Sequence, residues 1–221
     1  MKETIYTQNR ELSWLRFNER VMDEAKEKGV PAFEKLKFIS IFTSNLDEFF
    51  MIRVGSLYDQ TFMAKPQIDN KTGMDAEEQL AEVFKAVAPL YKKRDKIYKE
   101  VTGLLQEKGI TYVEMSSMTP VGRRYAEDYF TSYIQPILSP QIINAHHPFP
   151  HLLNKALYIV LLLKIKEKTA YGIVPVPTTL ERVVHVPGDN TRYTLLEDLV
   201  CEYVDRVFDN CTIEAKSIIT V

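Results

Sequence analysis

The stretch RELSWLRFNERVMDEAKEK, residues 10–28, decides how the first half of the chain folds. Apolar side chains recur in it every three or four residues, at Trp14, Phe17, Val21 and Ala25. Charged residues fill most positions between them, which is the pattern of an amphipathic helix. Asn9 or Ser13 can cap the start of this helix, and Gly29 is suited to end it. The apolar side is expected to be buried against other helices.

The same helical spacing continues through most of the first 108 residues. It predicts further helices in three segments, 31–42, 45–62 and 75–108, with a loop at 64–73. Pro89 falls inside the last helix, where its missing N–H donor predicts a kink or a split. Residues 1–108 are therefore predicted to form an antiparallel helical bundle of ordinary domain size.

The pattern changes after Gly109, where short β-rich segments alternate with helical ones. Strands are predicted at 110–115, 157–165, 171–176 and 182–186, and helices at 119–134 and 195–208. Residues 109–221 are thus predicted to be an α+β domain, and the whole chain to belong to the α+β class. The closing residues, SIITV, form an apolar strand without a polar tail, so this domain is expected to be incomplete at its C-terminal end.

The composition is that of a folded cytoplasmic protein. Hydrophobic residues make up 45% of the chain and charged residues 26%, and the net charge of -2 offers no positive field that would gather nucleic acid. The two cysteines, Cys201 and Cys211, lack CxxC spacing and are expected to be reduced thiols. No signal peptide is visible, and the longest apolar run, 156–163, is too short for a transmembrane segment.

Three of the four histidines fall within six residues, at His146, His147 and His151. Imidazole is a common zinc ligand, but both cysteines lie far downstream and no carboxylate is close in sequence. Two prolines in the same loop favour a stiff structural corner instead. No metal site is predicted here. Glycine-rich phosphate loops of the P-loop or GxGxxG type are also absent from the sequence.

The segment 43–50, TSNLDEFF, interrupts an apolar pattern with polar residues. One interpretation is a helix cap, in which Ser44 or Asn45 accepts a backbone N–H and the following acidic residues favour the helix start. The other is that Asn45 presents its amide, both donor and acceptor, to the edge of a heterocycle. The residue types alone favour the cap.

Two runs of residues, however, resemble a known family. The first is 10–21 followed by 44–49, and the second is LSP at 138–140 with HPFP at 147–150 and Asn154. Both are similar to the amino-terminal and head domains of bacterial polyphosphate kinase, which transfers the terminal phosphate of ATP reversibly onto polyphosphate. The resemblance covers nearly the whole chain. The family has an acidic residue and a proline where this chain has Asn144 and Ala145, which weakens any role assigned to that loop by analogy.

The resemblance implies that this chain is part of a longer enzyme whose domains have different roles. Its helical domain contributes one wall of the adenine site of ATP, with Asn45 at the position that contacts the nucleotide and the aromatic surroundings of Phe49 and Phe50 beside it. The head domain is associated with dimers, so residues 155–165 are expected to help bury a partner. The phosphorylated histidine and the magnesium ligands lie in downstream domains. None of this chain's four histidines, His185 included, is therefore expected to be catalytic.

A rival interpretation comes from another functional class. The two halves would then be a non-catalytic helical interaction module, with a protein-binding surface on residues 80–105, and an α+β dimerisation domain. That interpretation gives no reason for the NLDEF run at 45–49. The two interpretations also differ in the length of the protein they require. A kinase needs a reading frame that continues past Val221, whereas an interaction module does not.

Overall fold

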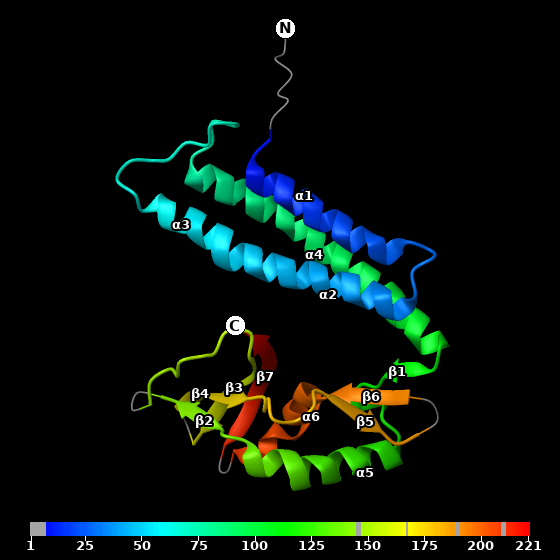
Figure 1. The fold of residues 1–221 in the computed structure, drawn as a ribbon. Helices are drawn as coiled ribbons and strands as arrows, with labels where there is room; N and C mark the ends of the chain where they lie inside the picture. The colour runs from blue at the N-terminus through cyan, green and yellow to red at the C-terminus, as the bar shows by residue number, and fades with distance from the viewer. Residues whose placement is uncertain (1–7, 145–146, 167, 189–190, 209–210) are drawn as a thin grey trace. The chain divides into compact units, whose positions relative to one another are not determined.

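The computed structural model describes residues 8–144, 147–166, 168–188, 191–208 and 211–221. The chain divides into two compact units, which meet between Lys108 and Gly109. The first unit is built from helices, and the second combines two sheets with helices (Figure 1). The predicted α+β class is therefore confirmed. No described helix combines the length and the apolar character that crossing a membrane requires.

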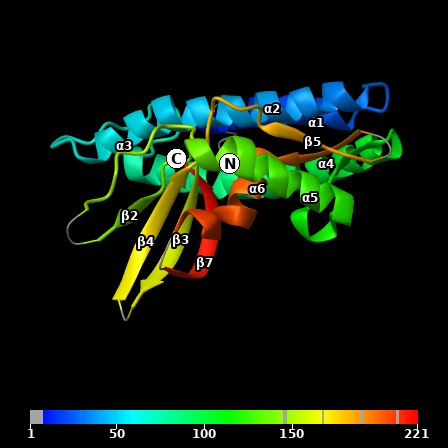
Figure 2. The ribbon, with the colours of Figure 1, turned by 90° about the horizontal axis from the view of Figure 1, so that it is seen from below.

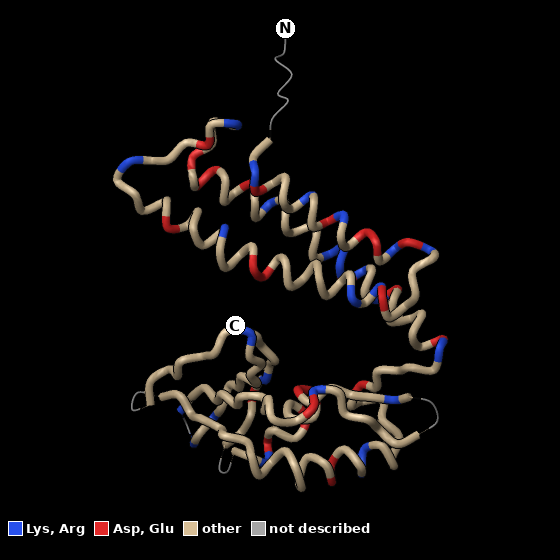
Figure 3. The backbone as a smooth tube through the Cα atoms, in the orientation of Figure 1, with Lys and Arg blue, Asp and Glu red and all other residues tan. Residues whose placement is uncertain are grey.

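The first unit contains three helical rods that lie side by side (Figures 1 and 2). The second rod along the chain is continuous, because a π-helical turn joins two α-helices without a break. The elements are α1 (Arg10–Asp23), a 3-10 turn (Glu24–Lys26), α2 (Ala32–Phe49), a π-helical turn (Phe50–Val54), α3 (Gly55–Thr61) and α4 (Ala76–Glu107). Lysines, arginines and acidic residues are interspersed along all three rods (Figure 3).

The buried side of α1 differs from the predicted one. Leu15 and Met22 of α1 are buried and Phe17 is 49% exposed, whereas Ala25, in the 3-10 turn that follows, is buried as predicted. The prediction was wrong for Phe17 because α1 packs against both α2 and α4, and the line between these two neighbours selects the buried side. Periodicity shows that α1 has an apolar side, but it does not show that Phe17, at the edge of that side, stays at the surface.

Pro89 does not split α4, which runs unbroken over 32 residues. A proline inside a helix removes one hydrogen bond and costs about 3 kcal/mol. Buried apolar side chains on both sides of Pro89, among them Val83, Val87, Leu90 and Ile97, hold the two halves of α4 to the same neighbours. Burial of one such side chain contributes about 1.5–3 kcal/mol, so several offset the cost.

Asn9 caps α1, as the sequence predicts. Its Oδ1 accepts from the backbone N–H groups of Glu11 and Leu12 at 2.9 and 3.2 Å. Its Nδ2 donates to Oε1 of Gln79 on α4 at 2.7 Å, and the side chain is almost fully buried. The cap therefore also joins the start of α1 to the start of α4.

The second unit contains two sheets and two main helices. The β1-β6-β5 sheet pairs β1 with β6 in parallel and β5 with β6 antiparallel, and the β2-β4-β3-β7 sheet is antiparallel throughout (Figure 1). The strands are β1 (Ile110–Tyr112), β2 (Gln141–Ile143), β3 (Leu157–Ile165), β4 (Lys168–Pro175), β5 (Val183–Val186), β6 (Thr191–Leu195) and β7 (Thr212–Thr220). The helices are α5 (Pro120–Tyr129), continued by a π-helical turn (Phe130–Ile134), and α6 (Leu196–Tyr203). Short 3-10 turns lie at Met115–Ser117, Gln135–Ile137 and Val204–Val207.

The core of this unit lies between the helices and one face of the four-stranded sheet. Its fully buried side chains come from the π-helical turn, β3 and α6, among them Phe130, Leu161 and Leu199. The strands predicted at 157–165, 171–176 and 182–186 are confirmed, and so is the strand at the end of the chain. Strands β2 and β6 were not predicted, because β2 is only three residues long and β6 is short and rich in polar residues.

Candidate functional site

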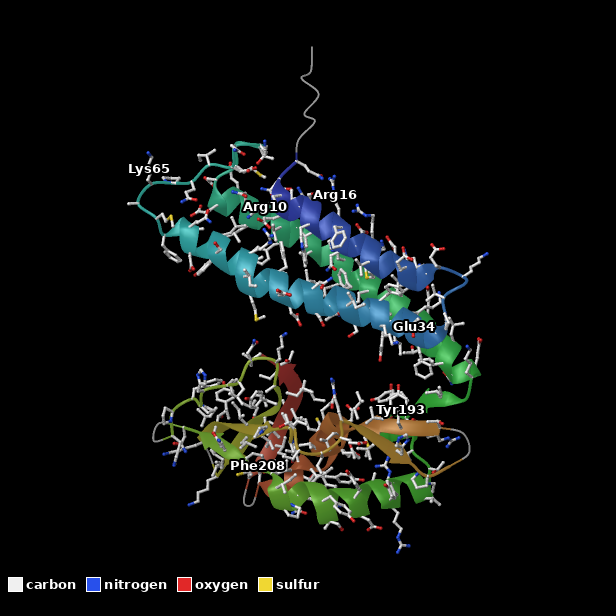
Figure 4. All side chains as sticks on the ribbon, in the orientation of Figure 1. Arg10, Arg16, Glu34, Lys65, Tyr193 and Phe208 are labelled. Atoms are coloured by element: carbon white, nitrogen blue, oxygen red, sulfur yellow. The ribbon has the colours of Figure 1, made fainter. Side chains whose placement is uncertain are left out.

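A groove of about 490 Å³ runs between α1 and the continuous α2–α3 rod of the first unit. Arg10, labelled in Figure 4, marks one end of it on α1. Asn45 lines the groove from α2. The remaining lining residues are Glu11, Trp14, Phe17, Glu48, Phe49, Ile52, Arg53, Ser56, Leu57 and Gln60. The groove therefore combines an aromatic wall, a charged end at Arg10 and two side-chain amides, those of Asn45 and Gln60.

Asn45 lies inside α2 and not at a helix end. The helix begins at Ala32 and runs through Phe49, so Ser44 and Asn45 are three turns or more past its start. The cap interpretation is therefore wrong for both residues. The polar run misled the prediction because these residues face a neighbouring helix or solvent, and the hydrogen bonding of the α2 backbone continues past them.

The amide of Asn45 belongs to a short hydrogen-bonded chain. Its Nδ2 donates to Oδ1 of Asn18 at 3.0 Å. Nδ2 of Asn18 in turn donates to the backbone carbonyl of Phe42 at 3.0 Å. Asn18 is fully buried, whereas Asn45 is partly exposed in the groove. No sequence pattern singles out Asn18, because a single asparagine within an amphipathic helix is compatible with many roles.

Aromatic rings form one wall of the groove. Trp14 stacks on Phe49, with ring centroids 4.5 Å apart and planes 8° apart. Phe17 adds an exposed ring on the same helix as Trp14. Phe50 does not line the groove, because it packs against Phe84 of α4 with centroids 6.0 Å apart. Of the two expected phenylalanines, only Phe49 therefore contributes to the wall, and Trp14 and Phe17 were not predicted for it.

The charged end of the groove is an arginine–carboxylate cluster. Arg10 donates to Oε1 of Glu11 through Nε at 3.0 Å and Nη2 at 2.9 Å, and Nη1 of Arg53 lies 3.5 Å from the same oxygen. The Glu11 side chain is only 5% exposed. Its Oε2 has no hydrogen-bond partner among the described residues. The negative charge of the buried carboxylate partly offsets the positive charges of the two guanidinium groups. This end of the groove is therefore not a purely positive site for anions.

The described residues of the histidine loop are not grouped with other metal ligands. His147 lies in a turn, where its backbone N–H donates to Oδ1 of Asn144 at 3.1 Å. His147 and His151 are exposed, and His146 lies outside the described residues. Within the described ranges, no three histidine, cysteine, aspartate or glutamate side chains are grouped as a metal site requires. These residues therefore do not fit a zinc or magnesium centre.

A second polar cluster lies in the other unit. Tyr112 Oη donates to Oδ2 of Asp198 at 2.8 Å, and burial raises the pKa of the Asp198 carboxyl. Next to Asp198 in α6, Glu197 is buried and accepts from Nε and Nη2 of Arg182, at 2.9 and 2.5 Å to Oε1. These contacts tie β1 and the segment before β5 to the start of α6. Because each carboxylate is already engaged by a side chain from another segment of the same unit, we interpret the cluster as structural.

Comparison with known proteins gives consistent matches along the chain. Residues 7–113 match the polyphosphate kinase N-terminal domain, and residues 122–221 match the polyphosphate kinase middle domain. The polyphosphate kinases of Bacillus cereus and Halalkalibacterium halodurans are 40% and 36% identical over 97% and 98% of this chain. Each match covers 32% of the relative, so the chain spans about a third of their length. The crystal structure of polyphosphate kinase from Porphyromonas gingivalis is similar to this chain, with a TM-score of 0.81 and 28% sequence identity. The match covers 97% of this chain and 32% of the Porphyromonas gingivalis chain.

Proposed function

Because the chain belongs to the polyphosphate kinase family, as its N-terminal and middle domains, we propose that its helical unit supplies one wall of the ATP site. The full-length enzyme would transfer the γ-phosphate of ATP reversibly to polyphosphate. A histidine outside these 221 residues would attack the γ-phosphorus, and ADP would leave. The phosphorylated histidine would then pass its phosphoryl group to the end of a polyphosphate chain. The two compact units would be the enzyme's amino-terminal and head domains.

The observation that carries this proposal is the amide of Asn45 in the lining of an aromatic-walled groove. An amide offers the donor and acceptor that a purine edge requires, and the Trp14–Phe49 stack provides an apolar border beside it. Phosphoryl transfer depends mainly on positioning and on stabilising charge. This chain would contribute positioning. The charge stabilisation, including any magnesium, would come from the enzyme's other domains, as the resemblance to the family implies.

The proposal predicts that Asn45→Ala raises the KM for ATP of the full-length enzyme by roughly 2- to 10-fold, since one neutral hydrogen bond contributes about 0.5–1.5 kcal/mol. The turnover number should change little, because the reacting groups lie elsewhere. The measurement is the rate of polyphosphate formation across an ATP titration with magnesium present.

Ser44→Ala is the matched control, because Ser44 is adjacent on α2 but exposed and outside the groove lining. It should leave the ATP dependence unchanged. Equal ATP dependence of the wild type and Asn45→Ala would contradict the contact between Asn45 and the base. A folded wild-type enzyme that makes no polyphosphate would contradict the kinase assignment and favour the interaction module.

We further propose that the enzyme is a homo-oligomer assembled through the second unit. Strand β3 is paired on both edges, with β4 and with β7, so a partner can reach only its face. An apolar depression of about 220 Å³ lies there, lined by Ile143, Phe149, Val160, Tyr171 and Ile173. Sedimentation of the full-length enzyme is expected to show a dimer or larger species, and a monomer at micromolar concentration would contradict this.

We place the enzyme in the cytoplasm, a reducing compartment that suits the thiol of Cys201, and cell fractionation tests this.

A further inference from the structure

We propose that Asn18 fixes the direction of the Asn45 amide, so that the groove accepts a 6-aminopurine and discriminates against a 6-oxopurine. Asn18 would then be a positioning residue that does not touch the nucleotide itself. The inference rests on the proposed contact between Asn45 and the base. It goes beyond that contact because it states which chemical group Asn45 turns toward the base and what prevents the reverse arrangement.

The Phe42 carbonyl fixes which side-chain atom of Asn18 faces it. The backbone carbonyl of Phe42 is an acceptor only, and the Asn18 side chain lies 3.0 Å from it. Asn18 must therefore direct its Nδ2 to this oxygen. The side chain is fully buried, so water does not offer an alternative partner. Asparagine oxygen and nitrogen are distinguished by such networks, and here the network has one consistent assignment.

The same constraint passes from Asn18 to Asn45. With Nδ2 of Asn18 committed to Phe42, its Oδ1 faces Asn45 and requires a donor. Nδ2 of Asn45 supplies that donor at 3.0 Å. Turning the Asn45 amide over would place two carbonyl oxygens at this separation. Turning Asn18 over as well would place its oxygen against the Phe42 carbonyl. Both inversions replace a hydrogen bond with a repulsive contact, so the observed direction is held.

The held amide leaves two groups for a ligand in the groove, the Oδ1 oxygen and the second N–H of Nδ2. No described residue donates to Oδ1 of Asn45. This pair matches adenine, whose N6 amino group donates next to a ring nitrogen that accepts. Hypoxanthine carries an acceptor, O6, in place of the amino group, and this would meet Oδ1. A freely rotating amide would adapt by turning its N–H toward O6, but the Asn18 contact opposes that rotation.

The test compares ATP with inosine triphosphate, ITP, in the full-length enzyme, using the ratio of their kcat/KM values for polyphosphate formation. The wild type should prefer ATP by roughly 10-fold or more, because a site built around one hydrogen-bonding pattern rejects the reversed pattern. Asn18→Leu removes the acceptor and frees the Asn45 amide, so the ratio should fall to within about 3-fold of unity. Met22→Ala is the control, since Met22 is buried one turn along α1 and is not hydrogen-bonded to Asn45. It should lower stability and leave the ratio unchanged.

A second variant keeps the test decisive if Asn18→Leu does not fold. Asn18→Ala also removes the acceptor that holds Nδ2 of Asn45, without adding bulk to the buried position, so the ATP/ITP ratio should fall in the same way. An unchanged ATP/ITP ratio in folded Asn18→Leu or Asn18→Ala, or equal use of ATP and ITP by the wild type, would each overturn the inference. If Asn45→Ala nevertheless raises the KM for ATP, the proposed function stands. If Asn45→Ala changes nothing, the proposed function itself has failed.

Discussion

Replacing Phe42 with alanine is expected to lower the free energy of unfolding of the helical unit by about 3–5 kcal/mol. Phe42 is fully buried at the centre of the cluster formed by α1, α2 and α4. Removing its ring leaves a cavity that three packed helices can close only in part. The backbone carbonyl that anchors Asn18 is retained in this variant, so the loss isolates packing from hydrogen bonding.

The chain contains its own probe for this experiment. Trp14 is the single tryptophan, and it stacks on Phe49 within the first unit. Urea unfolding followed by tryptophan fluorescence therefore reports on the helical unit alone. Phe33→Ala is the matched control, because Phe33 lies on the same helix but is 56% exposed, and it should change the free energy of unfolding by no more than about 0.5 kcal/mol. Equal shifts for the two variants would show that Phe42 is not the centre of the core.

The second large effect is expected at Arg182 in the other unit, where alanine should destabilise by about 1–3 kcal/mol, because Glu197 is nearly buried although the Arg182 side chain is 62% exposed. The Glu197 carboxylate is 5% exposed and receives hydrogen bonds from Nε and Nη2 of Arg182. Without the guanidinium, a nearly buried charge at the start of α6 is left with a desolvation cost that nothing offsets. Thermal unfolding by circular dichroism should show a transition at lower temperature, while the Trp14 fluorescence transition of the first unit stays in place.

A double variant separates the lost ion pair from lost packing. Arg182→Ala with Glu197→Leu removes both charges and should recover most of the stability, because an apolar replacement of a buried pair is often neutral or stabilising. Arg124→Ala, an exposed arginine on α5, should have little effect and serves as the control. Failure of the double variant to recover stability would mean that Arg182 acts through its aliphatic stem and not through its charge.

Much of this architecture follows from local patterns in the chain. Helical spacing in 10–28 and 75–108 predicted two rods correctly, and the apolar run at 157–165 predicted β3 to the residue. The Asn9 cap was also predictable, because its side-chain type and its place before a periodic segment are local properties. Asn45 was selected through a family resemblance, not through its chemistry, and the structure places it in the groove.

Other features could be decided only when distant segments met. The buried side of α1 depends on where α2 and α4 lie, so Phe17 faces the groove and Leu15 the core. The Asn18–Asn45 hydrogen bond joins residues 27 positions apart. Helical period and capping are encoded within one or two turns of chain, and residue types reveal them directly. The direction of an amide depends on partners supplied by another helix, and only their packing decides it.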